Sequence, residues 1–162
     1  KSLLFSGTIA ENLSYADHSM STERIEKAAE IAQATEFILD KEDQYDSHIS
    51  QGGTNVSGGQ KQRLSIARAL AKDAPIYVFD DTFSALDLKT DQRLREAISQ
   101  ELKGSTILLV AQRVSTIMYA DQIVVLDQGK IAGVGTHQEL LKSCDIYYEI
   151  ASSQLSAEEL KQ

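Results

Sequence analysis

One strand–helix–strand run constrains the fold of this chain more than any other part of its sequence. Residues 76–79 form a continuous apolar run, and residues 106–111 form a second one after a helix-forming segment that extends to about Leu102. Apolar runs without alternation are typical of parallel strands buried on both faces. Two such strands joined by a helix make a parallel crossover unit. The sequence therefore predicts an α/β fold with a mostly parallel sheet flanked by helices.

A second constraint is the turn Ser57-Gly58-Gly59-Gln60, which leads directly into a helix-forming segment that ends near Lys72. Ser57 can cap that helix, and the two glycines let a bound group approach the backbone closely. Because the first N–H groups of a helix have no intrahelical partner, such a start can bind an anion. Taken alone, the turn is equally compatible with an ordinary capped helix.

Two adjacent carboxylates, Asp80 and Asp81, follow the first apolar run. The carboxyl ends of parallel strands lie at the edge of a sheet where ligands bind. One carboxylate there can bind Mg²⁺ while its neighbour orients a water molecule for attack on a phosphoryl group. Without other motifs, the pair is also compatible with a simple strand-end cap.

The rest of the chain alternates between helix and strand patterns. We predict a helix capped by Ser21 that runs to Asp40, with its apolar stripe in the core, and then an ordered loop over residues 41–55. Further along we predict a short helix at 115–119, a hairpin of residues 123–126 and 130–134, and helices at 136–142 and 146–154. The polar tail, residues 156–162, is expected to fray.

Composition narrows the function classes. The chain has 162 residues, 42% of them hydrophobic, and a net charge of -8 without a basic cluster, which suits one globular domain and argues against a nucleic-acid partner. The single Cys144 cannot form an internal disulfide, which favours a reducing, cytosolic setting. No apolar run approaches the roughly 18 residues that cross a bilayer, so any membrane link is expected to come through a partner or through further sequence.

Four motifs in this order resemble those of the nucleotide-binding domain of ABC transporters, specifically exporters whose ATPase domain is fused to transmembrane helices. The resemblance covers nearly the whole chain: residues 4–12 resemble the segment after the Q-loop, and residues 135–141 resemble the end of the domain. The four motifs are the signature sequence at 56–60, Walker B at 76–80, the D-loop at 84–87, and Gln112 in the place of the switch histidine.

The resemblance implies a P-loop NTPase-like domain truncated at its N-terminus, because no Gly-x-x-x-x-Gly-Lys-Ser/Thr (Walker A) loop occurs in the sequence. A preceding part would hold that loop, the aromatic residue that stacks on adenine, and the Q-loop glutamine directly before Lys1. Within the partial ATPase domain 1–162 we expect a helical subdomain at about 15–72, a core part at 73–155 and a tail. Without the strand that carries the Walker A loop, apolar sheet surface would be exposed. We therefore predict that copies of the isolated chain self-associate or exchange segments by domain swapping.

The resemblance also implies roles for individual residues. In this family two domains lie head to tail, and each ATP lies between the Walker motifs of one domain and the signature turn of the other. Asp80 would hold the Mg²⁺ of the chain's own ATP, and the signature turn would grip the γ-phosphate of the partner's ATP. The expected nucleotide-binding residues are Ser57, Gly58, Gly59 and Gln60 of the turn, with Ser84 and Asp87 of the D-loop.

Two positions depart from the family pattern. Active members place glutamate after the Walker B aspartate and histidine at the switch, where this chain has Asp81 and Gln112. The shorter Asp81 side chain withdraws the carboxylate by about 1 Å, and misplacement of that size can cost on the order of 10²-fold in rate. Gln112 can donate a hydrogen bond to the γ-phosphate but cannot carry a proton. We interpret Asp81 and Gln112 as the catalytic positions of a degenerate site; the alternative is harmless variation at both positions.

The resulting hypothesis is an ATP-binding and ATP-hydrolysing part of a heterodimeric, multidrug-type exporter at the cytoplasmic face of the cell membrane. Its cofactors would be ATP and Mg²⁺, and its partners a second ABC ATPase domain from a different chain and a transmembrane domain. The isolated chain is expected to be inactive. The alternatives are a non-transport ABC ATPase, which the acidic charge and residues 4–12 argue against, and a non-catalytic module that dimerises with nucleotide.

Overall fold

The computed structural model describes residues 2–161, apart from the side chains of Leu88 and Lys161. The chain forms two compact units, residues 1–108 and residues 109–162, and each is described by itself. Within residues 2–161, no helix combines the length and the apolar character that a membrane span requires.

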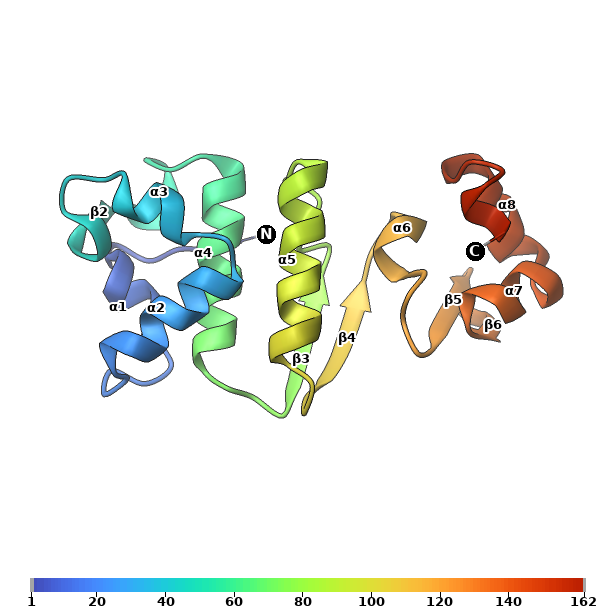
Figure 1. Ribbon diagram of the computed structural model, residues 1–162, viewed down its shortest axis with the longest axis horizontal. Helices are drawn as coiled ribbons and strands as arrows, with labels where there is room; N and C mark the ends of the chain where they lie inside the picture. Colours follow the sequence, from blue (N-terminus) through green and yellow to red (C-terminus); the bar gives the residue numbers. More distant parts are fainter. Residues whose placement is uncertain (1, 162) are drawn as a thin grey trace. The chain divides into compact units, whose positions relative to one another are not determined.

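The first unit begins with a small helical assembly around one long helix (Figure 1). Helix α4 (Gly58–Ala71) packs against α1 (Ile9–Leu13) and α2 (Thr22–Ile31), and the short strands β1 (Gly7–Thr8) and β2 (His48–Ile49) pair antiparallel. The largest fully buried side chains of this assembly are Leu4, Ile9, Leu13, Ile38, Ile49, Leu64 and Ile66.

The predicted continuous helix from Ser21 to Asp40 is wrong, because the chain breaks it into two helices. Ser21 caps α2 as predicted, but α2 ends at Ile31 and α3 (Thr35–Leu39) follows a separate start. Gln33 between them has a φ of +56°, in the left-handed region that ends helices. The Arg63 guanidinium donates a 2.7 Å hydrogen bond to the Gln33 carbonyl oxygen, and a contact from α4 therefore supports the break.

The predicted ordered loop at 41–55 is confirmed, with more local structure than the sequence indicates. It contains two 3₁₀ turns, Gln44–Asp46 and Gln51–Gly53, and strand β2. The Asn55 side chain accepts a hydrogen bond from the Ser50 N–H and donates one to the His48 carbonyl oxygen, at 2.9 and 2.8 Å. One amide side chain thus closes the loop just before the signature turn.

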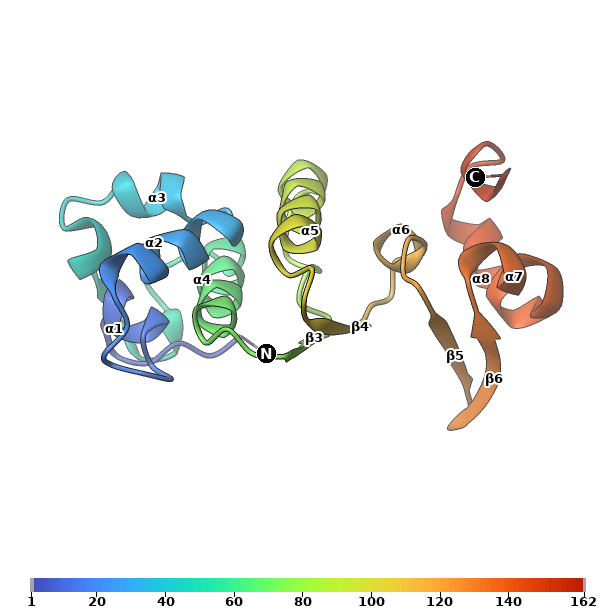
Figure 2. The same cartoon turned by 60° about the horizontal axis from the view of Figure 1, so that its bottom comes forward.

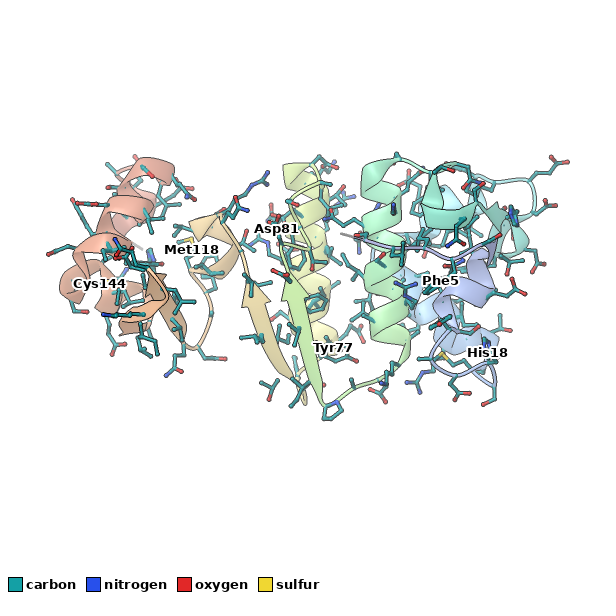
Figure 3. The ribbon with its side chains drawn as sticks, turned by 180° about the vertical axis from the view of Figure 1, so that it is seen from behind. Phe5, His18, Tyr77, Asp81, Met118 and Cys144 are labelled. Atoms are coloured by element: carbon teal, nitrogen blue, oxygen red, sulfur yellow. The ribbon has the colours of Figure 1, made fainter. Side chains whose placement is uncertain are left out.

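The predicted crossover unit is present. It consists of β3 (Ile76–Asp80), α5 (Leu88–Glu101) and β4 (Thr106–Val110), and the two strands pair with each other and point the same way in Figure 3. Figures 1 and 2 show α5 on one face of the pair.

Burial of β3 on both faces, however, is not observed. Tyr77 and Phe79 are buried, whereas Ile76 and Val78 are each 62% exposed. Because no described residues cover the second face of this strand, buried and exposed side chains alternate along it.

The second unit is a hairpin with helices packed around its own core. It comprises α6 (Val114–Ile117), the antiparallel strands β5 (Ile123–Asp127) and β6 (Lys130–Gly135), α7 (His137–Ser143) and α8 (Asp145–Gln154). Gln128 and Gly129 both have positive φ, the backbone that a tight two-residue hairpin turn requires. Its core is formed by Val114, Met118, Ile123, Val125, Leu140, Cys144, Tyr147, Ala151 and Leu155.

The expectation of a frayed tail is wrong for the described residues. The backbone N–H and the hydroxyl of Ser156 both donate to the Glu159 carboxylate, at 2.8 and 2.7 Å, and a 3₁₀ turn spans Glu159–Lys161. Leu160 packs against the core of the second unit. A capped turn and one apolar contact therefore order a segment that looks purely polar in sequence.

Candidate functional site

The signature turn forms a reciprocal cap at the start of α4. The Gln60 N–H donates to the Ser57 hydroxyl oxygen at 3.2 Å, and the Ser57 N–H donates to the Gln60 side-chain oxygen at 3.1 Å. This is a capping box, in which two side chains satisfy two of the N–H groups that a helix start leaves open. The predicted capping by Ser57 is confirmed, and Gln60 orders the turn.

The capping box leaves the two glycines as the open donors. Gly58 and Gly59 occupy the first two helical positions, where an N–H group has no intrahelical acceptor. Ser57 and Gly58 are exposed, and a Cβ atom on Gly58 would meet no other atom within 4 Å. A 14-residue helix also directs the positive end of its dipole here, so this exposed start can hold an anion.

The carboxylates lie at the end of β3, as predicted. Asp80 is the last residue of the strand and Asp81 follows it, and Figure 3 shows Asp81 near the tip of the strand with Tyr77 further back. Asp81 has a φ of +48°. The left-handed region is less costly for aspartate, whose short side chain can bond locally, than for a longer residue. The turn is closed by the Ser84 hydroxyl, which donates to the Asp81 carbonyl oxygen at 3.0 Å.

The donor set suits Mg²⁺ only in company with phosphate. Among the described residues, no group of three or more histidine, cysteine, aspartate or glutamate side chains could hold a metal ion. Asp80 and Asp81 are both exposed. Mg²⁺ is commonly bound by one or two carboxylates together with substrate phosphates, rather than by a cage made only of protein. The pair at the end of β3 fits that mode of binding.

One functional contact was missed in the sequence: Gln62 joins the signature helix to the turn after Asp81. The Ala85 N–H donates to Gln62 Oε1 at 3.1 Å, and Gln62 Nε2 is 3.5 Å from the Asp81 carbonyl oxygen. Gln62 is only 7% exposed. The sequence holds one signal for this contact, because Gln62 lies one helical turn before Ile66 and so places a polar residue in a buried stripe.

Ser84 and Asp87 lie on the same turn and are exposed. Asp87 caps α5, accepting hydrogen bonds from the Thr90 hydroxyl at 2.7 Å and the Thr90 N–H at 3.0 Å. These two bonds hold the pKa of the Asp87 carboxyl below its usual value. Ser84 and Asp87 are therefore placed together with Asp81, and Gln62 ties their turn to α4.

Gln112 lies in the second unit, just beyond β4, and its side chain is exposed. Gln154 of α8 holds the backbone directly after this side chain, because its Nε2 donates to the Gln112 carbonyl oxygen and its Oε1 accepts from the Val114 N–H. In the first unit, the predicted site residues Asp81 and Ser84 are therefore bonded to each other, and Gln62 links their turn to α4. In the second unit, Gln112 contacts Gln154.

Comparison with known proteins decides the family. The profile of the ABC transporter family matches residues 2–84. The chain belongs to this family. It is 45% identical over 157 residues to an uncharacterized ABC transporter ATP-binding protein of Mycobacterium tuberculosis. The matched region covers 95% of this chain and 27% of that relative. It is 46% identical over 138 residues to an ATP-dependent lipid A-core flippase of Legionella pneumophila, covering 85% of the chain and 24% of the relative.

A solved structure matches this ABC transporter chain in fold. A bacterial Atm1-family ABC exporter with ATP bound has a TM-score of 0.90 and 38% sequence identity, over 94% of this chain and 27% of the exporter chain. The predicted fold, the mixed α/β nucleotide-binding domain of an exporter-type ABC protein, is confirmed. The chain spans about a quarter of the length of the relatives that it matches.

Proposed function

We propose that the chain is part of the ATP-binding and ATP-hydrolysing domain of an ABC exporter, which powers efflux through ATP-driven dimerisation. The observation that carries this proposal is the start of α4. Its capping box satisfies the N–H groups of Ser57 and Gln60, and it leaves the N–H groups of the exposed Gly58 and the half-buried Gly59 without an intrahelical acceptor. Similarity to a lipid A-core flippase and to an ATP-bound Atm1-family exporter supports the transport role.

The signature turn would act on the ATP of a second domain. The sequence contains no Walker A loop, so these residues cannot enclose a triphosphate on their own. Gly58 faces open space, which suits an anion delivered from outside this chain. Ser57, Gly58 and Gly59 would contact the γ-phosphate of the partner's ATP while Gln60 keeps the turn in shape. Ser84 and Asp87 would border the same nucleotide from the D-loop.

The chain's own ATP would be served by a weaker set of groups. Asp80 would hold Mg²⁺, Asp81 would orient the attacking water, and Gln112 would donate a hydrogen bond to the γ-phosphate. Aspartate in place of glutamate and glutamine in place of histidine both reduce catalysis at the same site. We therefore assign the chain to the degenerate-site half of a heterodimeric, multidrug-type exporter, and we expect the chain by itself to be inactive.

The partners follow from this assignment. They are a second ABC ATPase domain on a different chain and a transmembrane domain, and the location is the cytoplasmic face of the cell membrane. The net charge of -8 argues against nucleic acid as a partner. Within the domain, residues 15–72 would form the helical subdomain, and residues 73–155 the part of the core with Walker B, the D-loop and the switch.

A second candidate is a non-catalytic module that dimerises when it binds nucleotide. Asp81 and Gln112 favour it, because neither is the residue that active members of the family carry. Measuring ATP hydrolysis distinguishes the two functions. The complete purified pair hydrolyses ATP if our proposal is right, and neither site hydrolyses ATP if the chain is a module of this second kind.

The degenerate site is tested by restoring the family residues. In the complete transporter, Asp81→Glu with Gln112→His should raise single-turnover hydrolysis at this chain's site by up to about 10²-fold, because the carboxylate advances by about one bond length. The partner's catalytic carboxylate is replaced beforehand so that only this site is read. Unchanged turnover would show that these two residues do not limit the site.

Two controls accompany this experiment. Asp127→Glu adds the same methylene at the end of β5, outside the site, and should leave turnover unchanged. Thermal unfolding of Asp81→Glu is needed as well, because residue 81 has a φ of +48°, where glutamate is more strained than aspartate. Turnover is compared only at temperatures where each variant is folded.

A further inference from the structure

The segment that carries Gln112 is held by the last long helix of the chain. Gln154, at the end of α8, accepts a hydrogen bond from the Val114 N–H at 2.9 Å and donates one to the Gln112 carbonyl oxygen at 3.0 Å. The amide side chain thus bonds the backbone on both sides of Arg113, as a neighbouring strand would. The two contacts bridge 40 and 42 residues of sequence, so they report tertiary packing rather than a local turn.

The segment needs these bonds because it lacks its own. Val114 begins α6, and the preceding Arg113 makes no side-chain capping bond, so the first N–H of that helix has no local acceptor. β4 ends at Val110, and the Gln112 carbonyl oxygen lies beyond the strand. Gln154 supplies the acceptor for one group and the donor for the other.

The amide that makes these bonds is itself fixed in place. Ala151 and Leu155, on either side of Gln154 in sequence, are buried in the core of the second unit together with Val114 and Met118. Apolar packing therefore sets the separation between the end of α8 and the start of α6. Because the end of α8 is fixed in this way, the two hydrogen bonds of the Gln154 amide hold the backbone at Gln112 in a defined position.

We propose that Gln154 is a positioning residue that aims Gln112 at the nucleotide, so that the C-terminal helix sets the catalytic competence of the switch. This inference rests on the proposed function, because it assigns Gln112 to the hydrolytic site. A hydrogen bond of this kind, when lost from an exposed segment, is expected to change kcat by about two- to tenfold.

The test is a double-mutant cycle in the complete transporter, read as single-turnover hydrolysis at this chain's site. Gln154→Met keeps the length of the side chain and removes both bonds, and it should lower kcat by about two- to tenfold with little change in KM. In a Gln112→Ala background the same substitution should have no further effect. Ser153→Ala, next to it on α8, is the control and should leave kcat unchanged.

A structural measurement separates this role from general support of the fold. Hydrogen exchange at the Val114 amide should become faster in Gln154→Met, while the amides of α7 keep their protection. Gln154→Glu keeps an acceptor for Val114 but loses the donor to Gln112, so it should protect Val114 and still lower kcat.

Three outcomes would overturn the inference, and they can be told apart. If the kcat loss from Gln154→Met is the same with and without the Gln112 side chain, Gln154 acts through the fold and not through Gln112. If exchange at Val114 is unaffected, the contact does not hold the segment. If Gln112→Ala alone leaves turnover unchanged, the assignment of Gln112 in the proposed function fails, and this inference fails with it.

Discussion

The Ala85 N–H donates a 3.1 Å hydrogen bond to the Gln62 side chain, and this bond connects α4 with the turn that follows β3. Gln62 is buried, and its other amide atom faces the Asp81 carbonyl oxygen. One side chain therefore links α4 to the turn that carries Asp81 and Ser84.

Removing that amide should destabilise the first unit. Gln62→Leu leaves the Ala85 N–H without its acceptor, and an unpaired, partly buried donor costs about 1–3 kcal/mol. We expect a lower free energy of unfolding in denaturant titrations and faster hydrogen exchange at residues 83–86. Gln92→Leu removes an exposed amide that bonds with the exposed Glu96, and it should cost much less. Equal losses in the two variants would contradict a specific role for Gln62.

Substitution of Gly58 in the signature turn should affect folding stability and ATP hydrolysis differently. A Cβ atom on Gly58 meets nothing within 4 Å, and alanine favours a helix over glycine by up to about 1 kcal/mol, so Gly58→Ala should keep or raise stability. In the complete transporter the added methyl group would occupy the space through which a phosphate reaches the helix start. We expect hydrolysis at the partner's site to fall by about tenfold or more, which corresponds to about 1.4 kcal/mol.

The control for this glycine is Gly104→Ala, because a Cβ atom there also meets nothing within 4 Å and the residue lies outside the site. Its ATPase rate should match that of the unmodified transporter. Normal activity in Gly58→Ala would show that no phosphate approaches this glycine.

The second unit should lose stability in mild acid because of His137. This ring is buried, its Nδ1 lies 2.7 Å from the Tyr147 hydroxyl, and its Nε2 has no hydrogen-bond partner among the described residues. Burial lowers the pKa of His137 in the folded chain, so the unfolded chain binds the proton more tightly. The stability is therefore complete above the ordinary histidine pKa of about 6.5 and declines as pH falls below it.

Hydrogen exchange of the core amides of residues 109–162, followed between pH 7.5 and pH 5 and corrected for intrinsic rates, would measure this decline. His137→Asn keeps a polar atom near Tyr147 but cannot titrate in this range, so its stability should vary less with pH. A decline of the same size in both proteins would assign the acid sensitivity to other groups.

The isolated chain should self-associate through the uncovered face of its crossover sheet. Ile76 and Val78 are each 62% exposed and Leu108 is 56% exposed, which leaves a row of large apolar side chains in water. We expect light scattering to show oligomers and a hydrophobic dye to bind. Val78→Thr, which keeps a β-branched side chain, should reduce both signals, whereas Val134→Thr in the hairpin should not. A monomeric chain that binds no dye would contradict this prediction.

Most of the fold was predictable because its signals are local. The apolar runs at β3 and β4, the hairpin turn at Gln128-Gly129 and the cap at Ser57 each lie within a few residues, and backbone geometry decides what such patterns form. The break between α2 and α3 was not predictable in this way. It depends on Arg63, 30 residues further along the chain, which bonds to the Gln33 carbonyl oxygen.

The candidate site divides along the same line. The sequence alone indicates the motifs that resemble those of the family, the capped start of α4 that we propose as an anion site, and the departures at Asp81 and Gln112, because these features depend on residue identity and short spacing. Two contacts come instead from tertiary packing: Gln62 joins α4 to the Asp81–Asp87 turn, and Gln154 holds the backbone at Gln112. A glutamine amide can bond to any backbone group within reach, and the packing of distant segments sets which groups are within reach.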